Sequence, residues 1–483
     1  MRRAKLLPLL LCVAAVQLAA GAGTAAASPQ GPGDVGRWSA PIDVGVIGIH
    51  AALLPTGEVL LYEYPFDQIG SEAHVIDPVT GENTDVSLRI RRNIFCSGHS
   101  LLPDGRVLAV GGEKYDGPGF NGIRAVTIYD PQTQTWTDGN AMFKARWYPT
   151  PVQMPDGTTL VLSGLAADGE TLVKRMESYD PDTEQWTLLP RSANSDSDLY
   201  PRMFVMPDGS VFRAGPNQEG VLFHPDSNSW SFVDNMNGGW RSFAGAVLLP
   251  EPDTTKAPER VFVAGGWGPL DSTEIIDLSD ATPQWTFSDG MHHARYNHNT
   301  VLLADGSILA VGGGQGPNLY DNPVRQAELY DPATGLWRDM ASQAANRTYH
   351  STALLLPDGR VVSAGSDGGD MPRTIEYYSP PYLFQGARPT ISSAPASITY
   401  GQAFSIGTPN AGAITRAALV RLGSTTHANN FEQRYADLAF SAGGGQLNAT
   451  APAGPELAPP GHYMLFLLNS AGVPSVAKIL RLG

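Results

Sequence analysis

The sequence predicts an all-β protein, a seven-bladed β-propeller followed by a C-terminal β-sandwich. Three observations support this prediction. A hairpin pattern recurs about every 50 residues, a second pattern recurs between its copies, and both patterns stop near residue 386. No helix is indicated after the first 28 residues.

The recurring hairpin is an apolar run, a short turn with glycine, and a second apolar run that ends in small residues. Asp-Gly between two β-rich runs is a hairpin signal, because glycine supplies the positive φ that the turn needs. The copies, one of them with a lengthened turn, are Ala51–Glu63, Ser100–Gly112, Pro151–Gly164, Met203–Gly215, Ala246–Gly266, Thr300–Gly313 and Thr352–Gly365. This period and core are typical of a kelch-type propeller blade.

An Asp-Pro turn followed by a tryptophan recurs between the hairpins. Asp130-Pro131 precedes Trp136, Asp180-Pro181 precedes Trp186 and Asp331-Pro332 precedes Trp337, while His224-Pro225 takes this place before Trp230. We interpret the turn as the connection between two outer strands and the tryptophans as packing between blades. The propeller is expected over residues 36–385, with the chain near residues 38–49 helping to close the ring.

Residues 386–483 lack both patterns. They alternate in short strands, such as Ala417–Leu422 and His462–Leu468, that are separated by Gly, Pro and Ser. This organisation is typical of an immunoglobulin-like β-sandwich. Because the ring is expected to close within one chain, we expect a monomer.

The N-terminal segment and the net charge limit the classes of function that the sequence allows. Residues 1–28 have the charged start, the apolar stretch Leu6–Ala20 and the small residues of a signal peptide, and no later stretch is apolar enough to span a membrane. The net charge of −15 argues against nucleic acid and anionic membrane surfaces as partners. We expect a secreted protein without stable membrane insertion. Cys12 falls in the signal peptide, so Cys96 is the one cysteine of the mature chain and no internal disulfide is expected.

Equal offsets from the turn glycine predict equivalent places in the ring. Nine residues before that glycine lie Cys96, Tyr148, Tyr200, Asn297 and His350, and Tyr349 is one residue earlier. Because the innermost strands line the axis of a propeller, this register predicts that these side chains lie near one end of the central channel. A thiol, phenols and an imidazole there suggest a metal site, and such N and O donors suit Cu(II). From spacing alone, a polar, water-filled funnel is the alternative.

Four segments resemble the galactose oxidase and glyoxal oxidase family of copper-radical oxidases. In order they are Asn93–Ser100 (NIFCSGHS), Ala145–Tyr148 (ARWY), Arg347–Ser351 (RTYHS) and Gly423–Asn430 (GSTTHANN). The resemblance covers essentially the whole mature chain. It does not include the additional N-terminal carbohydrate-binding domain of galactose oxidase, so the chain is more similar to glyoxal oxidase-like bacterial members.

The resemblance implies a role for each site residue. Cys96 and Tyr148 would be joined by a thioether, and Tyr148 would ligate one copper ion and store a radical. Tyr349 would be the axial ligand and general base. His350 and His427 would be the imidazole ligands, with His427 supplied by a loop of the C-terminal domain that reaches into the channel.

The resemblance also implies an aromatic ring stacked on Tyr148. Trp240, in Gly238–Phe243 (GGWRSF), is the candidate because it opens the fifth blade at the equivalent end of the channel. Trp147 is expected to point to the opposite side of its strand, and Arg241 to face the substrate.

The predicted function is oxidation of a primary alcohol or small aldehyde by dioxygen, with release of hydrogen peroxide. Whether the substrate is a glycan or a small molecule stays open. The alternative is a non-catalytic kelch propeller that binds a glycan or protein at the cell surface, which would have no reason to hold this ligand set. His292 and His293, with His298 close behind, are interpreted as polar loop residues.

Overall fold

The computed structural model describes residues 30–64, 70–88, 92–114, 120–369 and 371–483. The expected signal peptide lies outside these residues. Strands dominate, as predicted. The helical segments of the described chain are short: α1 (Pro32–Val35) and the 3₁₀ turns Arg191–Ala193, Pro381–Phe384 and Ala411–Ala413. None of these helices has the length and apolar character that crossing a bilayer requires.

Five consecutive stretches each form one four-stranded antiparallel sheet. The first is β7 (Gly98–Leu101), β8 (Val107–Val110), β9 (Val126–Asp130) and β10 (Thr135–Asp138). The second is β11 (Thr150–Gln153), β12 (Thr159–Leu162), β13 (Glu177–Asp180) and β14 (Gln185–Leu188). The third is β15 (Met203–Val205), β16 (Val211–Arg213), β17 (Glu219–His224) and β18 (Ser229–Asn235). The fourth is β19 (Gly245–Leu248), β20 (Arg260–Ala264), β21 (Thr273–Asp277) and β22 (Thr286–Ser288). The fifth is β23 (Tyr296–Leu302), β24 (Ile308–Gly314), β25 (Gln326–Asp331) and β26 (Leu336–Ser342).

Two more sheets join distant parts of the chain. One combines β27 (Ser351–Leu355), β28 (Val361–Gly365) and β29 (Thr374–Ser379) with the N-terminal strands β1 (Arg37–Trp38) and β2 (Ile42–Asp43). The other combines β3 (His50–Leu53), β4 (Val59–Tyr62), β5 (Ala73–Ile76) and β6 (Asn83–Asp85) with β33 (Ser424–Thr426) and β34 (Asn429–Asn430). β1 and β2 therefore pair with β29 in the last sheet of the N-terminal body, whereas their role in closing a ring stays a prediction. We use "N-terminal body" for β1–β29.

The predicted hairpins form around the repeated glycines. Gly105, Gly157 and Gly359 have φ of 95°, 87° and 82°, which only glycine adopts without strain. Innermost strands contact one another from sheet to sheet, β27 with β3, β7 with β11, β11 with β15, and β19 with β23. The all-β fold is confirmed, whereas ring closure and the number of blades stay predictions.

The repeated tryptophans pack between sheets, as predicted. Each indole N–H donates to the preceding sheet or its following loop: Trp136 to the Val86 carbonyl, Trp186 to that of Asn140, Trp230 to that of Ala193, and Trp337 to the Thr273 hydroxyl. Because each hydrogen bond joins two neighbouring sheets, these tryptophans hold consecutive sheets together.

Buried Arg–Glu pairs repeat within four sheets and were not anticipated. The pairs are Arg146–Glu177, Arg241–Glu274, Arg295–Glu328 and Arg347–Glu376, all with side chains 0% exposed. Each glutamate also accepts backbone N–H groups from the loop that leads into its sheet, at Phe143, Asn237, His292 and Ala344 respectively. Each glutamate therefore has a structural role, because it holds both the arginine and the entry loop.

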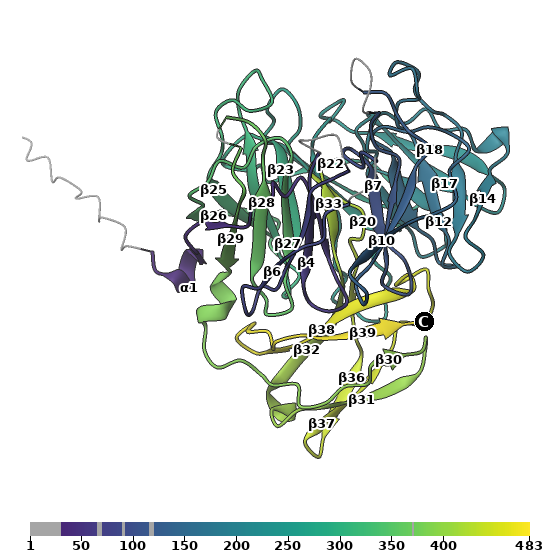
Figure 1. Ribbon diagram of the computed structural model, residues 1–483. Coiled ribbons are helices and arrows are strands. Elements are labelled where there is room, and N and C mark those ends of the chain that lie inside the picture. Colours follow the sequence, from purple (N-terminus) through teal and green to yellow (C-terminus); the bar gives the residue numbers. More distant parts are fainter. Residues whose placement is uncertain (1–29, 65–69, 89–91, 115–119, 370) are drawn as a thin grey trace, which may run out of the picture.

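The C-terminal region, Ser397–Leu482, forms two sheets of its own. One contains β30 (Ser397–Ile398), β32 (Ile414–Arg421), β35 (Tyr435–Asp437), β38 (Gly461–Asn469) and β39 (Lys478–Leu482). The other contains β31 (Ala403–Gly407), β36 (Phe440–Gly443) and β37 (Gln446–Thr450). They enclose a separate core with Leu447 and Leu465. Figure 1 shows β33, in yellow, leaving this region to run up between the strands of the N-terminal body.

Candidate metal centre

The residues that open the inner strands share an unusual backbone conformation. Cys96, Tyr148, Tyr200, Asn297 and His350 have φ of 60°, 63°, 46°, 55° and 63°, a region that few non-glycine residues adopt. These are the positions that the nine-residue offset picked out. Strained residues of this kind cluster at functional sites. The offset therefore identified a set of equivalent positions.

Backbone hydrogen bonds join these positions from sheet to sheet. The Tyr148 N–H donates to the Cys96 carbonyl at 3.0 Å, and the Tyr200 N–H donates to the Tyr148 carbonyl at 3.1 Å. Likewise, the Asn297 N–H donates to the Phe243 carbonyl at 2.9 Å. These bonds hold the openings of neighbouring inner strands close to one another.

The five side chains predicted for the metal centre meet in one place. The Tyr148 and Tyr349 hydroxyls contact each other, and the Tyr148 hydroxyl lies 3.5 Å from His350 Nε2. Cys96 Sγ lies 3.9 Å from His427 Nε2. The imidazole rings of His350 and His427 are 4.4 Å apart between centroids. Ligand atoms of Cys96, His350 and His427 all fall within 4.8 Å of one another.

The centre is shielded from water. Cys96 is 0% exposed and Tyr349, the most exposed of the five, is 8% exposed. Burial raises the pKa of the Cys96 thiol and of the Tyr148 and Tyr349 phenols well above their ordinary values, and it lowers the pKa of His427. Burial alone therefore favours a neutral site, and a bound cation would reverse that preference for the phenols.

Hydrogen bonding fixes the tautomer of His427. The Thr426 hydroxyl donates to the Ile49 carbonyl at 2.8 Å and lies 2.6 Å from His427 Nδ1. Because the hydroxyl hydrogen is used on Ile49, Nδ1 must carry the hydrogen that it shares with Thr426. The lone pair of Nε2 is then free, on the side of the ring that faces Cys96.

An acidic side chain orients His350 in a similar way. Asp367 Oδ2 lies 2.7 Å from His350 Nδ1, and Asp367 Oδ1 accepts a 2.7 Å hydrogen bond from the Tyr320 hydroxyl. A carboxylate on the outer nitrogen of a histidine is a common partner of metal-ligating imidazoles. Nε2 of His350 therefore also faces the phenols. Asp367 was not singled out by any sequence pattern.

His427 reaches the centre on a tight hairpin. β33 and β34 are joined by a two-residue turn, His427-Ala428, with φ of 50° and 63°. Two-residue turns with both φ values positive usually contain Asn-Gly, so this turn holds an imidazole where glycine or asparagine would be less strained. β33 pairs with β3, with Thr426 opposite His50.

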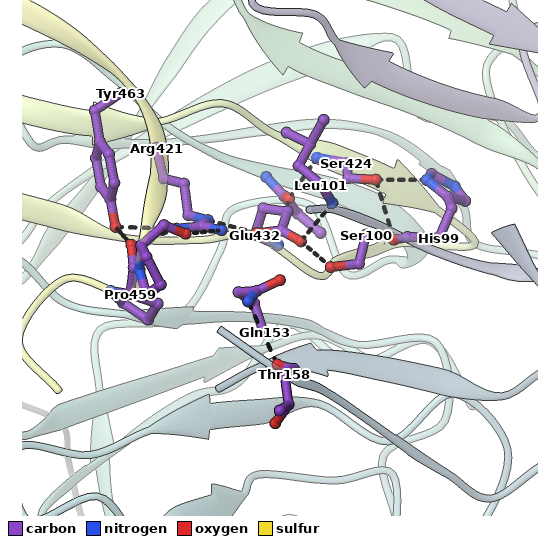
Figure 2. Close-up of polar contacts among 12 residues, drawn as sticks. His99, Ser100, Leu101, Gln153, Thr158, Arg421, Ser424, Glu432, Pro459 and Tyr463 are labelled. Atoms are coloured by element: carbon purple, nitrogen blue, oxygen red, sulfur yellow. Dashed lines mark hydrogen bonds and ion pairs between the residues drawn. The ribbon is translucent and has the colours of Figure 1, made fainter. Parts of the chain in front are cut away.

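A buried polar cluster fastens this hairpin to the strand that follows Cys96 (Figure 2). Glu432 accepts hydrogen bonds from the Ser100 hydroxyl, from the Leu101 N–H at 2.9 Å and from Arg421. On the hairpin itself, the Ser424 hydroxyl contacts His99 Nδ1 and the His99 carbonyl. The cluster joins β7 of the N-terminal body to both sides of the segment that carries His427.

Three orientation predictions, for Trp240, Trp147 and Arg241, were wrong. Trp147, not Trp240, stacks on Tyr148, with centroids 3.5 Å apart and planes at 10°. Trp240 is 48% exposed and its indole N–H donates to Asp198. The prediction for Trp147 assumed strand alternation, but the positive φ of Tyr148 breaks that alternation. Arg241 does not face a substrate either, since it is 0% exposed and paired with Glu274.

The set of matching positions also contains a buried amide that has no partner in the described part of the chain. Asn297 is 2% exposed, and neither its amide nitrogen nor its amide oxygen has a hydrogen-bond partner among the described residues. Buried polar groups are normally paired, so this amide has capacity for a polar ligand. Tyr200, at the matching position two sheets earlier, instead donates its hydroxyl to the Ser97 carbonyl.

The residues present fit a copper ion. Two imidazoles with free Nε2 atoms and two phenols are borderline N and O donors, the set that Cu(II) prefers over hard cations such as Mg²⁺ or Ca²⁺.

Comparisons with known proteins identify the family of the chain. Residues 54–380 match the family described as glyoxal oxidase N-terminus, and residues 388–482 match the galactose oxidase-like, early set domain. Galactose oxidase of Gibberella zeae is 30% identical over 94% of this chain and 71% of its own length. Aldehyde oxidase GLOX of Vitis pseudoreticulata is 28% identical over 92% of this chain and 97% of its own length. A solved fungal alcohol oxidase of the AA5 family, in complex with copper, superposes with a TM-score of 0.82 at 25% identity, over 93% of this chain and all of that one.

These matches define the class of protein: an oxidase built from two β-structured parts. The chain belongs to the galactose oxidase and glyoxal oxidase family of copper-radical oxidases.

Proposed function

We propose that this protein is a secreted mononuclear copper oxidase that converts a primary alcohol to an aldehyde, or a small aldehyde to an acid. Dioxygen takes up the two electrons and two protons and leaves as hydrogen peroxide. The observation that carries the proposal is the meeting of Cys96, Tyr148, Tyr349, His350 and His427 at one buried point, from four separate segments of the chain.

Tyr148, Tyr349, His350 and His427 would hold the ion. A bound Cu(II) would supply Lewis acidity and accept one electron. The Nδ1 atom of His427 is hydrogen-bonded to Thr426 and that of His350 lies 2.7 Å from Asp367, which leaves both Nε2 atoms for the ion. The backbone strain at Tyr148 and His350 fixes the donors before the ion arrives, which reduces the entropy lost on binding.

The second electron would be accepted by the oxidised form of a protein cofactor, a thioether between Cys96 Sγ and a ring carbon of Tyr148. Its formation removes the thiol hydrogen and one ring hydrogen, and dioxygen accepts both with two electrons. Both residues lie in one buried cluster, and the backbone bond between them holds their strand openings together. Trp147, stacked on Tyr148, would shield the oxidised ring from water.

In turnover, Tyr349 would take the proton of the substrate hydroxyl, because its own hydroxyl contacts Tyr148 at the centre. The oxidised Tyr148 would take a hydrogen atom from the substrate carbon. The unpaired amide of Asn297 is the group that we assign to a second polar atom of the substrate. An aldehyde would enter as its hydrate, which presents the same hydroxyl and C–H bond as an alcohol.

We further propose that the chain consists of three parts. Residues 1–28 would be a signal peptide, residues 36–385 a closed seven-bladed propeller, and residues 386–483 an immunoglobulin-like domain that supplies His427. The protein would act as a monomer.

Peroxide release from copper-loaded protein tests the function. We expect peroxide with primary alcohols or small aldehydes only after copper loading, and a loss of roughly 100-fold or more in Tyr349→Phe. Tyr400→Phe is the matched control, because the Tyr400 hydroxyl donates to Ala458 in the C-terminal region, away from the centre. Peroxide release by Tyr349→Phe at the wild-type rate would contradict the assigned role. No release from any alcohol or aldehyde by copper-bound protein would contradict the function.

A further inference from the structure

Blade-like sheet β23–β26 carries two histidines and an aspartate that converge on its outer edge. His292 and His293 lie in the loop between β22 and β23, and Asp339 lies on β26. His292 Nδ1 is 2.9 Å from Asp339 Oδ1, and His293 Nε2 is 3.6 Å from the same oxygen. Figure 1 shows β25 and β26 at the side of the N-terminal body.

The structural contact that repeats from sheet to sheet is made here by a backbone N–H group and not by the imidazoles. In four sheets the entry loop donates backbone N–H groups to the buried glutamate of the Arg–Glu pair. The loop residues that do so elsewhere are Phe143 and Lys144, Asn237 and Gly238, and Ala344 and Ala345. Since such different side chains serve equally, the fold does not require imidazoles at positions 292 and 293.

The same repeat decides the role of Glu328. One of its oxygens lies close to the ligand atoms of His292 and Asp339. However, Glu328 is 0% exposed, is paired with Arg295 and accepts the His292 N–H, as its counterparts do in the other sheets. Its charge is therefore compensated and its oxygens are used. The donors that remain are two imidazole nitrogens and the Asp339 carboxylate.

The spacing and charge of these donors suit a divalent cation. Ligands about 2.0–2.2 Å from an ion lie about 2.8–3.1 Å apart at octahedral angles and about 3.3–3.6 Å apart at tetrahedral angles. The two nitrogen–oxygen distances found here, 2.9 and 3.6 Å, fall in these ranges. Because Arg295 is neutralised by Glu328, Asp339 leaves one uncompensated negative charge. The side chains of His292, His293 and Asp339 are 47%, 37% and 47% exposed, so an ion could enter and keep water as further ligands.

We propose that His292, His293 and Asp339 form a second, surface site for a borderline divalent cation such as Zn²⁺ or Cu²⁺. Two imidazoles and one carboxylate favour such ions over Mg²⁺ or Ca²⁺. The site shares no residue with the buried centre, and it does not depend on the function proposed above.

Zinc titration of the copper-loaded protein tests the site. With one equivalent of copper per chain, which fills the buried centre alone, we expect calorimetry to detect one additional Zn²⁺ per chain at micromolar concentrations. His292→Ala and His293→Ala should each weaken this binding roughly tenfold or more, since loss of a ligand costs at least as much as loss of an outer-shell partner. Asp339→Asn should do the same.

His224→Asn is the matched control. His224 is an imidazole on β17 whose Nε2 contacts Ser231, so its removal should leave zinc binding unchanged. The three site variants should fold, because their side chains are substantially exposed and the His292 N–H still bonds to Glu328. Thermal unfolding checks this. If the wild type binds no additional zinc, or if the His292→Ala/His293→Ala double variant binds it as tightly as the wild type, the two histidines are hydrogen-bond partners of Asp339 and the proposal fails.

Discussion

Glu432, in the segment that follows the His427 hairpin, accepts a hydrogen bond from Ser100, which lies four residues after Cys96. The same carboxylate accepts the Leu101 N–H and is paired with Arg421, all in the interior. Two segments that each carry a residue of the metal centre are therefore joined by one buried acid (Figure 2). This arrangement predicts that the acid sets the position of His427.

Replacing Glu432 should weaken copper binding. In Glu432→Gln the new amide hydrogens face Arg421, so the ion pair is lost while the size of the side chain is kept. We expect copper affinity to fall by about 10–100-fold, as for other outer-shell partners of metal ligands. Competition with a chelator measures it. Asp437→Asn is the control, because Asp437 pairs with Arg416, which also bonds across to the N-terminal body but does not touch the hairpin. Equal copper affinities in the two variants would contradict the positioning role.

The stacked ring predicts unequal effects of two tryptophan substitutions. Trp147→Leu removes the ring that stacks on Tyr148, so the oxidised tyrosine should decay severalfold faster. Trp240→Leu should leave its lifetime unchanged, because Trp240 is half-exposed and bonded to Asp198. The decay of the radical absorbance or of its electron paramagnetic resonance signal measures both. The opposite ranking would restore the assignment that the sequence suggested.

Glycine at position 428 should stabilise the turn that presents His427. Ala428 has φ of 63°, which costs a residue with a Cβ about 1–2 kcal/mol. We expect Ala428→Gly to raise the free energy of unfolding by about 1 kcal/mol in urea titrations, with copper binding retained. Ala442→Gly, at an exposed position in strand β36, should instead lower it. Destabilisation by Ala428→Gly would show that the turn is not strained at that residue.

Because some histidines are buried and neutral in the folded protein, we expect acid to lower its stability. Burial lowers the pKa of His99 to about 3, whereas the unfolded chain takes up a proton near pH 6.5. The unfolded state therefore binds more protons as the pH falls from about 6.5 towards 3, and stability falls with it. In His99→Asn the slope of unfolding free energy against pH should be shallower by up to about 1.4 kcal/mol per pH unit in this window.

His462 provides a second test of the same effect. Burial, with nearby Arg481 and Arg421, lowers its pKa to about 4. His462→Asn should therefore reduce the slope between about pH 6.5 and 4 but not below. Urea titrations at a series of pH values measure both variants. Unchanged slopes would mean that these two histidines do not contribute to acid unfolding.

The sequence was informative where local chemistry and repetition agree. Glycine in the repeated turns and a fixed offset from it were enough to group Cys96, Tyr148 and His350, because every copy of the hairpin imposes the same geometry. The packing of the repeated tryptophans between sheets could be predicted for the same reason. The GSTTHANN segment was expected to be a loop that carries His427 into the N-terminal body, and it instead forms the hairpin β33–β34, which pairs with β3.

Other features left no sequence signal. His427-Ala428 has none of the glycine or asparagine that marks a two-residue turn, so its geometry could not be foreseen. The Arg146–Glu177 pair joins residues about 30 apart, and neither residue type is distinctive. Trp147 was misplaced because strand alternation does not hold next to a residue with positive φ.

The covalent state of Cys96 separates an oxidase from a propeller that only binds a ligand. The apoprotein is loaded with Cu(II) in air, digested, and analysed by mass spectrometry. We expect a peptide that joins Cys96 to Tyr148 and is lighter by two hydrogens than the sum of its parts, and we expect Tyr148→Phe to lack this peptide. Free Cys96 after full copper loading would rule out the proposed oxidase.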